Sequence, residues 1–180
     1  MSEILKSILI TGVSGFVGKQ LLPVLSKHGL YINAAVRRNL NNLTDNINPI
    51  NIGNVDGNTK WHQALGGIDT VIHLVARAHI LYDNTSNPEG EFLKINTEGT
   101  ANLVKQSIAA GVKHFIFISS IGAMATLSDH HLTETSPCQP DTPYGRSKLQ
   151  AEQALIELAS QSNMTWTILR PTLVYGSGNP

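Results

Sequence analysis

Residues 7–18 read SILITGVSGFVG, an apolar run that leads straight into a loop with three glycines. The run has the length and apolarity of a buried β-strand, and Gly12, Gly15 and Gly18 follow it. Glycine tolerates positive φ in a tight turn, and its missing side chain lets the backbone approach a diphosphate. A helix that begins here directs free N–H groups at the anion. Glycines also end strands for steric reasons, but their place between strand and helix favours dinucleotide binding.

The rest of the chain alternates apolar runs of strand length with amphipathic segments of helix length. This alternation predicts an α/β fold, a doubly wound parallel sheet (Rossmann fold) with helices on both faces. Ligands are then expected beyond the carboxyl ends of the strands. No repeat or linker divides the chain, so residues 1–180 are expected to form one domain. Strands are expected at 7–11, 31–36, near 50–52, 69–75, 114–119 and 166–170, and helices at 15–29, 89–111 and 144–160.

The composition excludes several classes of partner. Thirteen basic and thirteen acidic residues cancel, so nothing favours a nucleic acid or an anionic membrane surface. No apolar run approaches the roughly 18–20 residues of a membrane span, and the first residues lack the layout of a secretory signal. The single cysteine, Cys138, cannot form an intrachain disulfide. We therefore expect a cytoplasmic protein. The spacing of the seven histidines, including the adjacent His130 and His131, predicts no metal site.

The stretch YGRSK, residues 144–148, places Tyr144 and Lys148 four residues apart and thus on one face of a helix. A neighbouring ammonium favours a phenolate, so we expect a lowered pKa that makes Tyr144 an acid–base at a carbinol or carbonyl oxygen. Such a pair is more often an ordinary helix face. The preceding ISS, residues 118–120, strengthens the catalytic interpretation, because a serine at the end of that strand can hydrogen-bond the same oxygen.

Five stretches in this order, TGVSGFVG, HLVA, FISS, YGRSK and LRPTLVYG, resemble the extended short-chain dehydrogenase/reductase family of NAD(P)-dependent nucleotide-sugar epimerases, dehydratases and reductases. The resemblance covers essentially the whole chain. It implies that Ser120, Tyr144 and Lys148 are catalytic, with Ser119 as the alternative if the register is off by one. It also implies hydride transfer at a sugar carbon. Tyr144 would exchange the proton, Ser120 would polarise the oxygen, and Lys148 would also hold the nicotinamide ribose.

The resemblance further implies a set of residues that contact an NAD(P) cofactor. Asn54 stands where the family commonly has an acid that receives the adenine amino group, and an amide oxygen can accept the same bond. Asn96 resembles a family asparagine near the active-site strands, although a structural cap on a backbone carbonyl explains it equally well. The expected cofactor-binding residues are Gly12, Gly15, Phe16, Val17, Gly18, Arg37, Arg38, Asn54, Val55, Leu74, Ala76, Arg77, Asn96, Tyr144, Lys148 and Pro171.

Two arginines, Arg37 and Arg38, follow the second expected strand, where an acid often holds the ribose 2′-OH. Arginine instead offers planar forks of donors to a 2′-phosphate, which favours NADP and leaves NAD possible. Alternatively, the pair lies in a solvated loop or stacks on adenine. An NADP preference would favour a 4-keto-sugar reductase, whereas a general likeness to UDP-sugar 4-epimerases of surface-polysaccharide pathways favours an epimerase.

Other functions are weighed against these two. A 4,6-dehydratase is disfavoured, because the family's dehydratases carry Asp-Glu after the catalytic hydroxyl and Ile121 and Gly122 stand here. A catalytically silent NAD(P)-sensing protein on the same fold stays open. Family members normally continue into a carboxyl-terminal substrate lobe, and we expect this chain to lack that lobe. Helices 89–110 and 144–160 match those of the family's dimer interface, so a homodimer that binds a nucleotide-sugar substrate is expected.

Overall fold

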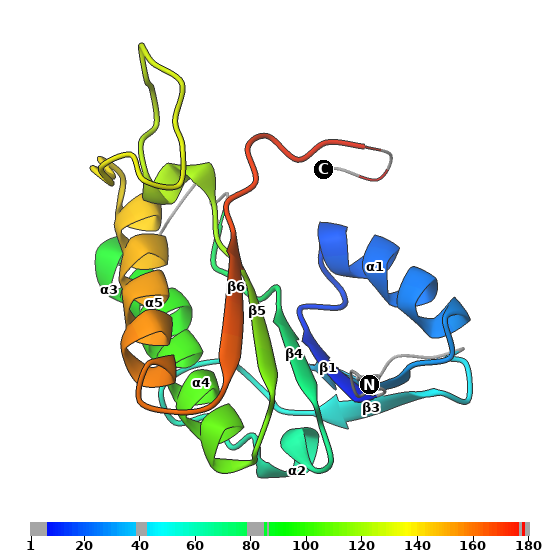
Figure 1. The fold of residues 1–180 in the computed structure, drawn as a ribbon. Coiled ribbons are helices and arrows are strands. Elements are labelled where there is room, and N and C mark those ends of the chain that lie inside the picture. Colours follow the sequence, from blue (N-terminus) through cyan, green and yellow to red (C-terminus); the bar gives the residue numbers. More distant parts are fainter. Residues whose placement is uncertain (1–6, 39–42, 79–84, 86, 177, 179–180) are drawn as a thin grey trace.

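A computed structural model of the chain describes residues 7–38, 43–78, 85, 87–176 and 178. Its centre is a six-stranded parallel sheet with the strand order β3-β2-β1-β4-β5-β6 (Figure 1). Successive strands are added outward from β1 to β3 on one side and from β4 to β6 on the other, which is the strand order of a dinucleotide-binding doubly wound sheet. The expected α/β class is confirmed. The strands are β1 Ser7–Thr11, β2 Tyr31–Val36, β3 Ile47–Asn51, β4 Thr70–His73, β5 His114–Ile118 and β6 Thr165–Leu169.

Helices cover both faces of the sheet (Figure 1). One face carries the first helix, and the opposite face carries the two longest helices of the second half. Two short segments, α2 and a 3₁₀ turn, were not expected, because four or three residues are too few to show a helical period. The segments are α1 Phe16–Lys27, α2 His62–Leu65, α3 Pro88–Phe92, the π-helix η1 Leu93–Glu98, α4 Gly99–Ala109, the 3₁₀ helix η2 Ile121–Ala123 and α5 Pro143–Ala159.

The sheet separates two hydrophobic cores. On one face, Leu22 of α1 packs with Ile10 and Ile32 of the central strands. On the other, Leu103 of α4 and Leu155 of α5 pack with strand residues and with the fully buried Trp61. Strands that are covered twice must be apolar on both faces, which is why the central runs read as nearly continuous hydrophobic stretches.

The third strand and the helix expected over 89–111 differ from the sequence expectation for physical reasons. The third strand begins at Ile47, three residues before the expected start, and it contains Pro49. A proline is tolerated there because β3 is an edge strand with one side free of partners. The segment 89–111 was expected to be one regular α-helix. In the structure it is helical through α3, η1 and α4, but the hydrogen bonds of its middle part, η1, are π-helical.

The register of the sheet gathers the functional stretches at one edge. Thr11 lies opposite Ala35 of β2 and His73 of β4, and His73 lies opposite Phe117 of β5. The carboxyl ends of four strands therefore meet in one row, followed by the glycine loop, the Arg37 turn, the 74–78 segment and the Ser120 turn. This is the edge where a doubly wound sheet binds its ligand.

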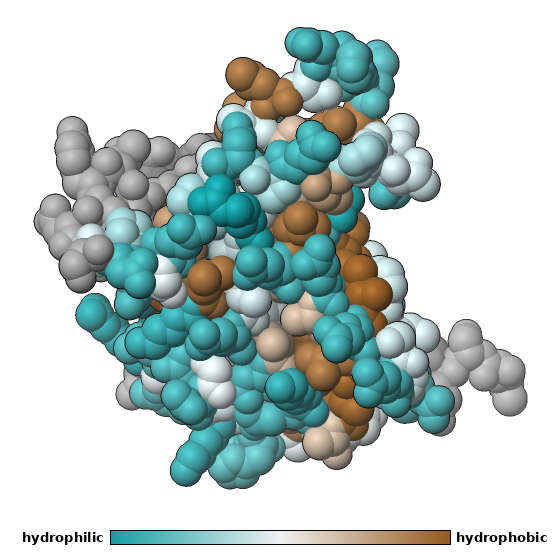
Figure 2. Space-filling view, turned by 90° about the vertical axis from the view of Figure 1, so that its left-hand side faces the viewer, coloured by the Kyte–Doolittle hydropathy of each residue, from teal (hydrophilic) through white to brown (hydrophobic). Residues whose placement is uncertain are grey.

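The side of the molecule that carries α3, α4 and α5 has a mixed surface, with hydrophilic side chains around an apolar band (Figure 2). Exposed apolar residues of this half include Ile156 of α5 and Leu169 of the edge strand β6. Among the described residues, no helix is both long enough and apolar enough to cross a membrane.

Candidate active site

The glycine loop after β1 is shaped by two positions where a side chain does not fit. Gly12 has φ +74°, and a Cβ there would lie 3.0 Å from the backbone of Leu74. A Cβ on Gly18 would lie only 2.2 Å from the carbonyl oxygen of Gly12. The loop thus packs backbone against backbone, on the neighbouring strand and on the first turn of α1. Helix α1 begins after Gly15, and no side chain caps that end, so its first N–H groups are free to meet an anion.

A cleft of about 600 Å³ opens between this loop and the ends of β2 and β4, within the size range of cofactor sites. Eight of the expected cofactor-binding residues line it, and the other eight do not. The sequence reasoning also missed ten lining residues. Three of these lie on the α3–η1 segment, where a long helix gave no sign of facing a ligand. The expected lining residues are Gly12, Gly15, Arg37, Asn54, Val55, Leu74, Ala76 and Arg77; the missed ones are Ser14, Ala35, Val36, Ile52, Asp56, Val75, Ala78, Glu91, Lys94 and Ile95.

The cleft fits a dinucleotide in shape and chemistry. Gly12 and Gly15 leave the loop backbone accessible from the cleft at the helix N-terminus, where a diphosphate would bind. The turn after β2 places Arg37 on the cleft wall and Arg38 exposed beside it. The ends of the cleft are therefore a cationic turn and, beyond β4, residues 74–78.

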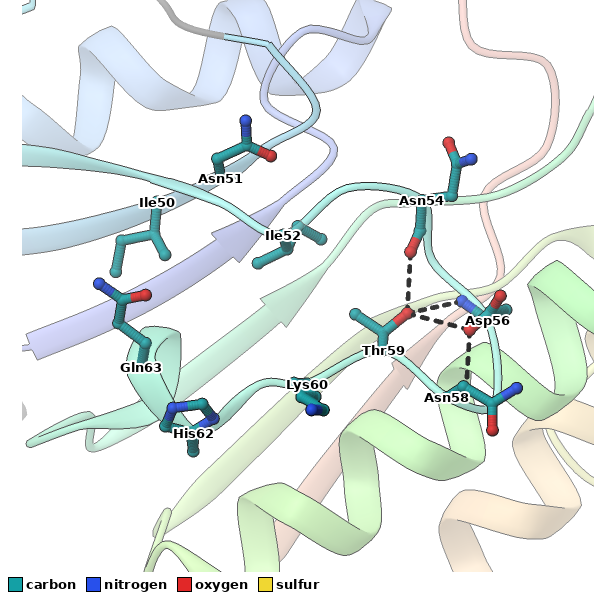
Figure 3. Close-up of a pocket in the computed structure, with 10 residues that line it drawn as sticks. All are labelled: Ile50, Asn51, Ile52, Asn54, Asp56, Asn58, Thr59, Lys60, His62 and Gln63. Atoms are coloured by element: carbon teal, nitrogen blue, oxygen red, sulfur yellow. Dashed lines mark hydrogen bonds between the residues drawn. The ribbon is translucent and has the colours of Figure 1, made fainter.

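The loop with Asn54 also lines a second depression, of about 540 Å³ (Figure 3). The loop is held from that side: the hydroxyl of Thr59 donates to the Asn54 carbonyl oxygen at 2.8 Å and accepts from the Asp56 N–H at 2.9 Å. The Asn54 amide itself points away from Thr59 (Figure 3). Its side chain is thus free to meet a ligand, while its backbone is fixed.

Ser120 and Tyr144 are brought together by two turns in contact. Ser120 caps the 3₁₀ helix η2, where its Oγ accepts from the Gly122 N–H at 3.1 Å. Tyr144 lies in the first turn of α5. A Cβ on Gly145 would lie 2.1 Å from the Gly122 carbonyl oxygen, so glycine lets the two turns touch. A Cβ on Gly122 would lie 3.3 Å from Ser120 Oγ and 3.9 Å from the Tyr144 ring, so both side chains lie beside Gly122.

The protonation of Tyr144 differs from the expectation. Burial raises the pKa of Tyr144, and the Ser120 side chain lowers it by less. The expectation of a lowered pKa is wrong for the protein without ligands. The reason is that the Lys148 ammonium is turned to the sheet: its Nζ donates to the Ile118 carbonyl oxygen at 2.7 Å and lies 4.1 Å from the centre of the Phe117 ring. Tyr144 is therefore a neutral phenol here.

Lys148 is 1% exposed and lies one helical turn after Tyr144. Burial lowers the pKa of Lys148 to about 7, while the negative charge of Glu152 acts in the opposite direction. At neutral pH the ammonium of Lys148 is thus close to losing its proton, whereas an ordinary surface lysine stays fully protonated.

The comparisons with known proteins give the family. The sequence pattern of the NAD dependent epimerase/dehydratase family matches residues 8–180. The chain belongs to this family. UDP-glucose 4-epimerase of Vibrio cholerae is 39% identical over 175 residues, which are 96% of this chain and 53% of that protein. An undecaprenol-diphosphate-linked N-acetylglucosaminyl 4-epimerase of Escherichia coli O157:H7 is 33% identical over 178 residues, 96% of this chain and 50% of that protein.

Solved structures agree with this assignment. MoeE5 in complex with UDP-glucose and NAD superposes with a TM-score of 0.79 at 27% identity, over 91% of this chain and 53% of that one. UDP-glucose 4-epimerase of Thermotoga maritima with UDP-glucose superposes with a TM-score of 0.76 at 26% identity, over 91% of this chain and 54% of that one. The chain thus spans about half the length of the relatives it matches.

In this member of the epimerase/dehydratase family, Asn96 joins the cofactor cleft to the Tyr144 helix. Its Oδ1 accepts from the Arg77 N–H at 2.7 Å, and its Nδ2 donates to the Arg77 carbonyl oxygen at 3.1 Å and to Ser147 Oγ at 2.9 Å. Ser147 in turn donates to the Tyr144 carbonyl oxygen at 2.7 Å. Asn96 lies in the π-helical turn, a type of irregularity often found at functional sites. These bonds match the structural alternative, and a direct cofactor contact stays a prediction.

The remaining candidates have structural partners. His73, buried at the end of β4, lies between the hydroxyls of Thr11 at 2.7 Å and Thr100 at 3.1 Å. Burial lowers the pKa of His73 to about 3, so it is neutral. The Pro171 carbonyl oxygen accepts from the Ile121 N–H at 2.9 Å, which fixes that segment beside the Ser120 turn. Within the described ranges, no group of three or more His, Cys, Asp or Glu side chains could hold a metal ion.

Proposed function

We propose that this family member transfers hydride at a sugar carbon of a nucleotide sugar, as a 4-epimerase or a 4-keto-sugar reductase. The observation that carries this proposal is the placement of Ser120 and Tyr144 together beside Gly122, with Lys148 one turn further along the Tyr144 helix. The pair lies at the strand edge that also holds the dinucleotide cleft. A sensor would need the cleft but has no use for an acid–base phenol with a serine hydroxyl beside it.

The three side chains have distinct roles in the proposed reaction. Bound NAD(P) supplies and takes up the hydride at the nicotinamide C4. Tyr144 gives a proton to the sugar oxygen or takes one from it, and Ser120 donates a hydrogen bond to that oxygen. Lys148 orients the nicotinamide ribose. The positive charge of an oxidised nicotinamide favours the phenolate, so we infer that the pKa of Tyr144 falls when the oxidised cofactor is bound.

The epimerase alternative is supported by the similar proteins described above, since three of them are 4-epimerases by name. The two candidates differ in their use of cofactor. A 4-epimerase interconverts UDP-glucose and UDP-galactose with no added reductant, because the cofactor returns to its starting state. A reductase consumes one NAD(P)H for each 4-keto sugar and does not interconvert the two hexoses. Incubating the complete gene product with UDP-glucose, with and without NADPH, and separating the products distinguishes them.

Cofactor choice depends on Arg37 and Arg38. The family and its solved relatives support NAD, whereas two arginines at the turn after β2 favour the 2′-phosphate of NADP. Both are exposed, Arg37 lines the cleft, and within the described residues neither takes part in a hydrogen bond or ion pair.

Replacing Arg37 and Arg38 by alanine is expected to weaken NADPH binding more than NADH binding. One charge-assisted phosphate contact is worth about 1.5–3 kcal/mol, or about 10–150-fold in Kd. Calorimetry with both cofactors on both proteins measures the difference, and Lys60→Ala, a charge removed outside the cleft, is the matched control. An equal rise in the Kd of NADPH and of NADH would contradict the NADP preference. It would show that the arginines contact the adenine or the diphosphate, which both cofactors share.

The extent of the domain and the oligomeric state also stay proposals. We propose that residues 1–180 are the cofactor-binding unit of a longer enzyme, in line with relatives of about twice the length. A homodimer through α4 and α5 is expected from the family resemblance.

A further inference from the structure

A buried carboxylate lies behind the proposed catalytic residues and takes no part in the roles assigned so far. Glu152 of α5 is 1% exposed and lies one helical turn after Lys148. The guanidinium of Arg170 donates to both of its oxygens, from Nε at 3.0 and 3.1 Å and from Nη2 at 2.5 Å. The hydroxyl of Ser119 donates to its Oε1.

These contacts join three elements that carry the site. Ser119 directly precedes Ser120 at the end of β5, and Arg170 directly precedes Pro171 after β6. Backbone bonds hold the same two segments together, because the Ser119 N–H donates to the Leu169 carbonyl oxygen at 2.7 Å. Glu152 connects these two segments to a third element, α5, the helix that carries Tyr144 and Lys148. One carboxylate thus fixes the hydroxyl-bearing turn relative to the phenol-bearing helix.

The same carboxylate also acts on the charge of Lys148. The other described titratable groups around Lys148 supply no negative charge. His73 of β4 is neutral and Tyr144 is a neutral phenol. Arg170, beyond β6, is positive, and Cys138 lies near its guanidinium. Glu152 is therefore the negative charge that favours the ammonium, against a burial that opposes it. A buried ion pair contributes little net stability in general, because desolvation of both charges offsets their attraction. Stability alone is then a weak reason for this cluster.

We propose that Glu152 is a positioning residue for the reaction: its carboxylate, fixed between Arg170 and Ser119, keeps Lys148 in its ammonium form and holds the Ser120 turn in place against the Tyr144 helix. The proposal rests on the proposed role of Lys148. It goes beyond that role by assigning the protonation of Lys148 to a residue that touches neither cofactor nor sugar.

The test is a direct titration of Lys148 in the protein without cofactor. Lysine labelled with ¹³C at Cε reports each ammonium by NMR, and Lys148→Arg identifies the signal. Glu152→Gln keeps the shape and removes the charge, so it is expected to lower the pKa of Lys148 by about one unit, the low end for an opposite charge nearby. Glu157→Gln, the same change at an exposed position of the same helix, is expected to leave it unchanged.

A second variant has the opposite sign and covers the case in which Glu152→Gln does not fold. Arg170→Gln removes the cation that competes for the carboxylate, so the pKa of Lys148 is expected to rise. Ser119→Ala removes a hydrogen bond and no charge, and should leave the pKa of Lys148 near its wild-type value. An unchanged pKa in Glu152→Gln, or a fall in Arg170→Gln, would overturn the proposal.

Turnover supplies the second readout. Removing Glu152's charge makes Lys148 deprotonate at lower pH, so the alkaline limb of the kcat profile of the complete gene product should move to lower pH by the same amount. The titration needs no turnover, so a failed enzymatic function and a failed role of Glu152 give different results. A profile that falls in height without moving along the pH axis would also contradict the proposal.

Discussion

Replacing Tyr144 by phenylalanine is expected to lower kcat of the complete gene product with its nucleotide sugar by about 10²–10⁴-fold, the usual contribution of a positioned general acid or base. The change removes one oxygen atom. Tyr144 lies outside the set of residues that line the dinucleotide cleft, so the Kd of the cofactor should stay within a few-fold. The loss should therefore be in the chemical step and should persist at saturating substrate.

Tyr31→Phe is the matched control, because Tyr31 lies at the start of β2, at the opposite end of the strands, and is 58% exposed. It should leave both kcat and the cofactor Kd unchanged. Near-normal turnover of Tyr144→Phe would show that another group exchanges the proton. A large loss of cofactor affinity in Tyr144→Phe would show instead that the phenol contributes to binding.

The substitution Gly18→Ala is expected to damage the dinucleotide site more than any other change of one methyl group in the loop. Its Cβ would lie 2.2 Å from the Gly12 carbonyl oxygen and 2.6 Å from the Val13 Cα, both backbone atoms. The first turn of α1 must then move away from the loop. Overpacking of this kind costs about 1–3 kcal/mol of folding free energy. The loss of one charge-assisted hydrogen bond to the diphosphate should also raise the Kd of the cofactor by a factor of about 10–150.

Denaturant unfolding and cofactor titration of this chain measure the two effects. Gly66→Ala is the matched control, since the nearest atom to its Cβ would be 3.8 Å away, an ordinary contact. It should change neither quantity appreciably. If Gly18→Ala bound the cofactor as tightly as the wild type, the diphosphate would lie elsewhere than at the N-terminus of α1.

The sequence predicted those parts of the fold that local pattern determines. The bounds of β1 and β2 are as expected, because each is a buried run followed by a residue that must turn. The π-helical turn at Leu93–Glu98 was not predictable, because its cause is tertiary: Asn96 reaches both the Arg77 backbone and Ser147. The hydrophobic periodicity of the surrounding helix does not indicate that Asn96 makes these tertiary hydrogen bonds.

The candidate site was predicted in its motifs and not in its electrostatics. The spacing of Tyr144 and Lys148 indicated a shared helix face, but not that the Lys148 ammonium would turn to the Ile118 carbonyl oxygen. Glu152 and Arg170 were missed, although Glu152 stands four residues after Lys148, the same spacing that singled out Tyr144. The pairing of Glu152 with Arg170 depends on a strand end 18 residues away, which only the folded chain brings near.

The central claim is that this protein moves a hydride between a nucleotide sugar and a bound nicotinamide, and does not merely sense the cofactor. The most direct test uses the complete gene product loaded with NAD or NADP in oxidised form and a UDP-hexose deuterated at C4. The reaction is quenched, and both the cofactor and the sugars are analysed by mass spectrometry. An epimerase should give the other hexose with its deuterium retained at C4, and a reductase running in reverse should give deuterated, reduced cofactor; we expect one of these in the wild type and a strong loss of it in Tyr144→Phe. Hexose that is not interconverted, together with cofactor free of deuterium, with UDP-glucose and UDP-galactose alike at saturating sugar, would contradict the claim and favour a sensor.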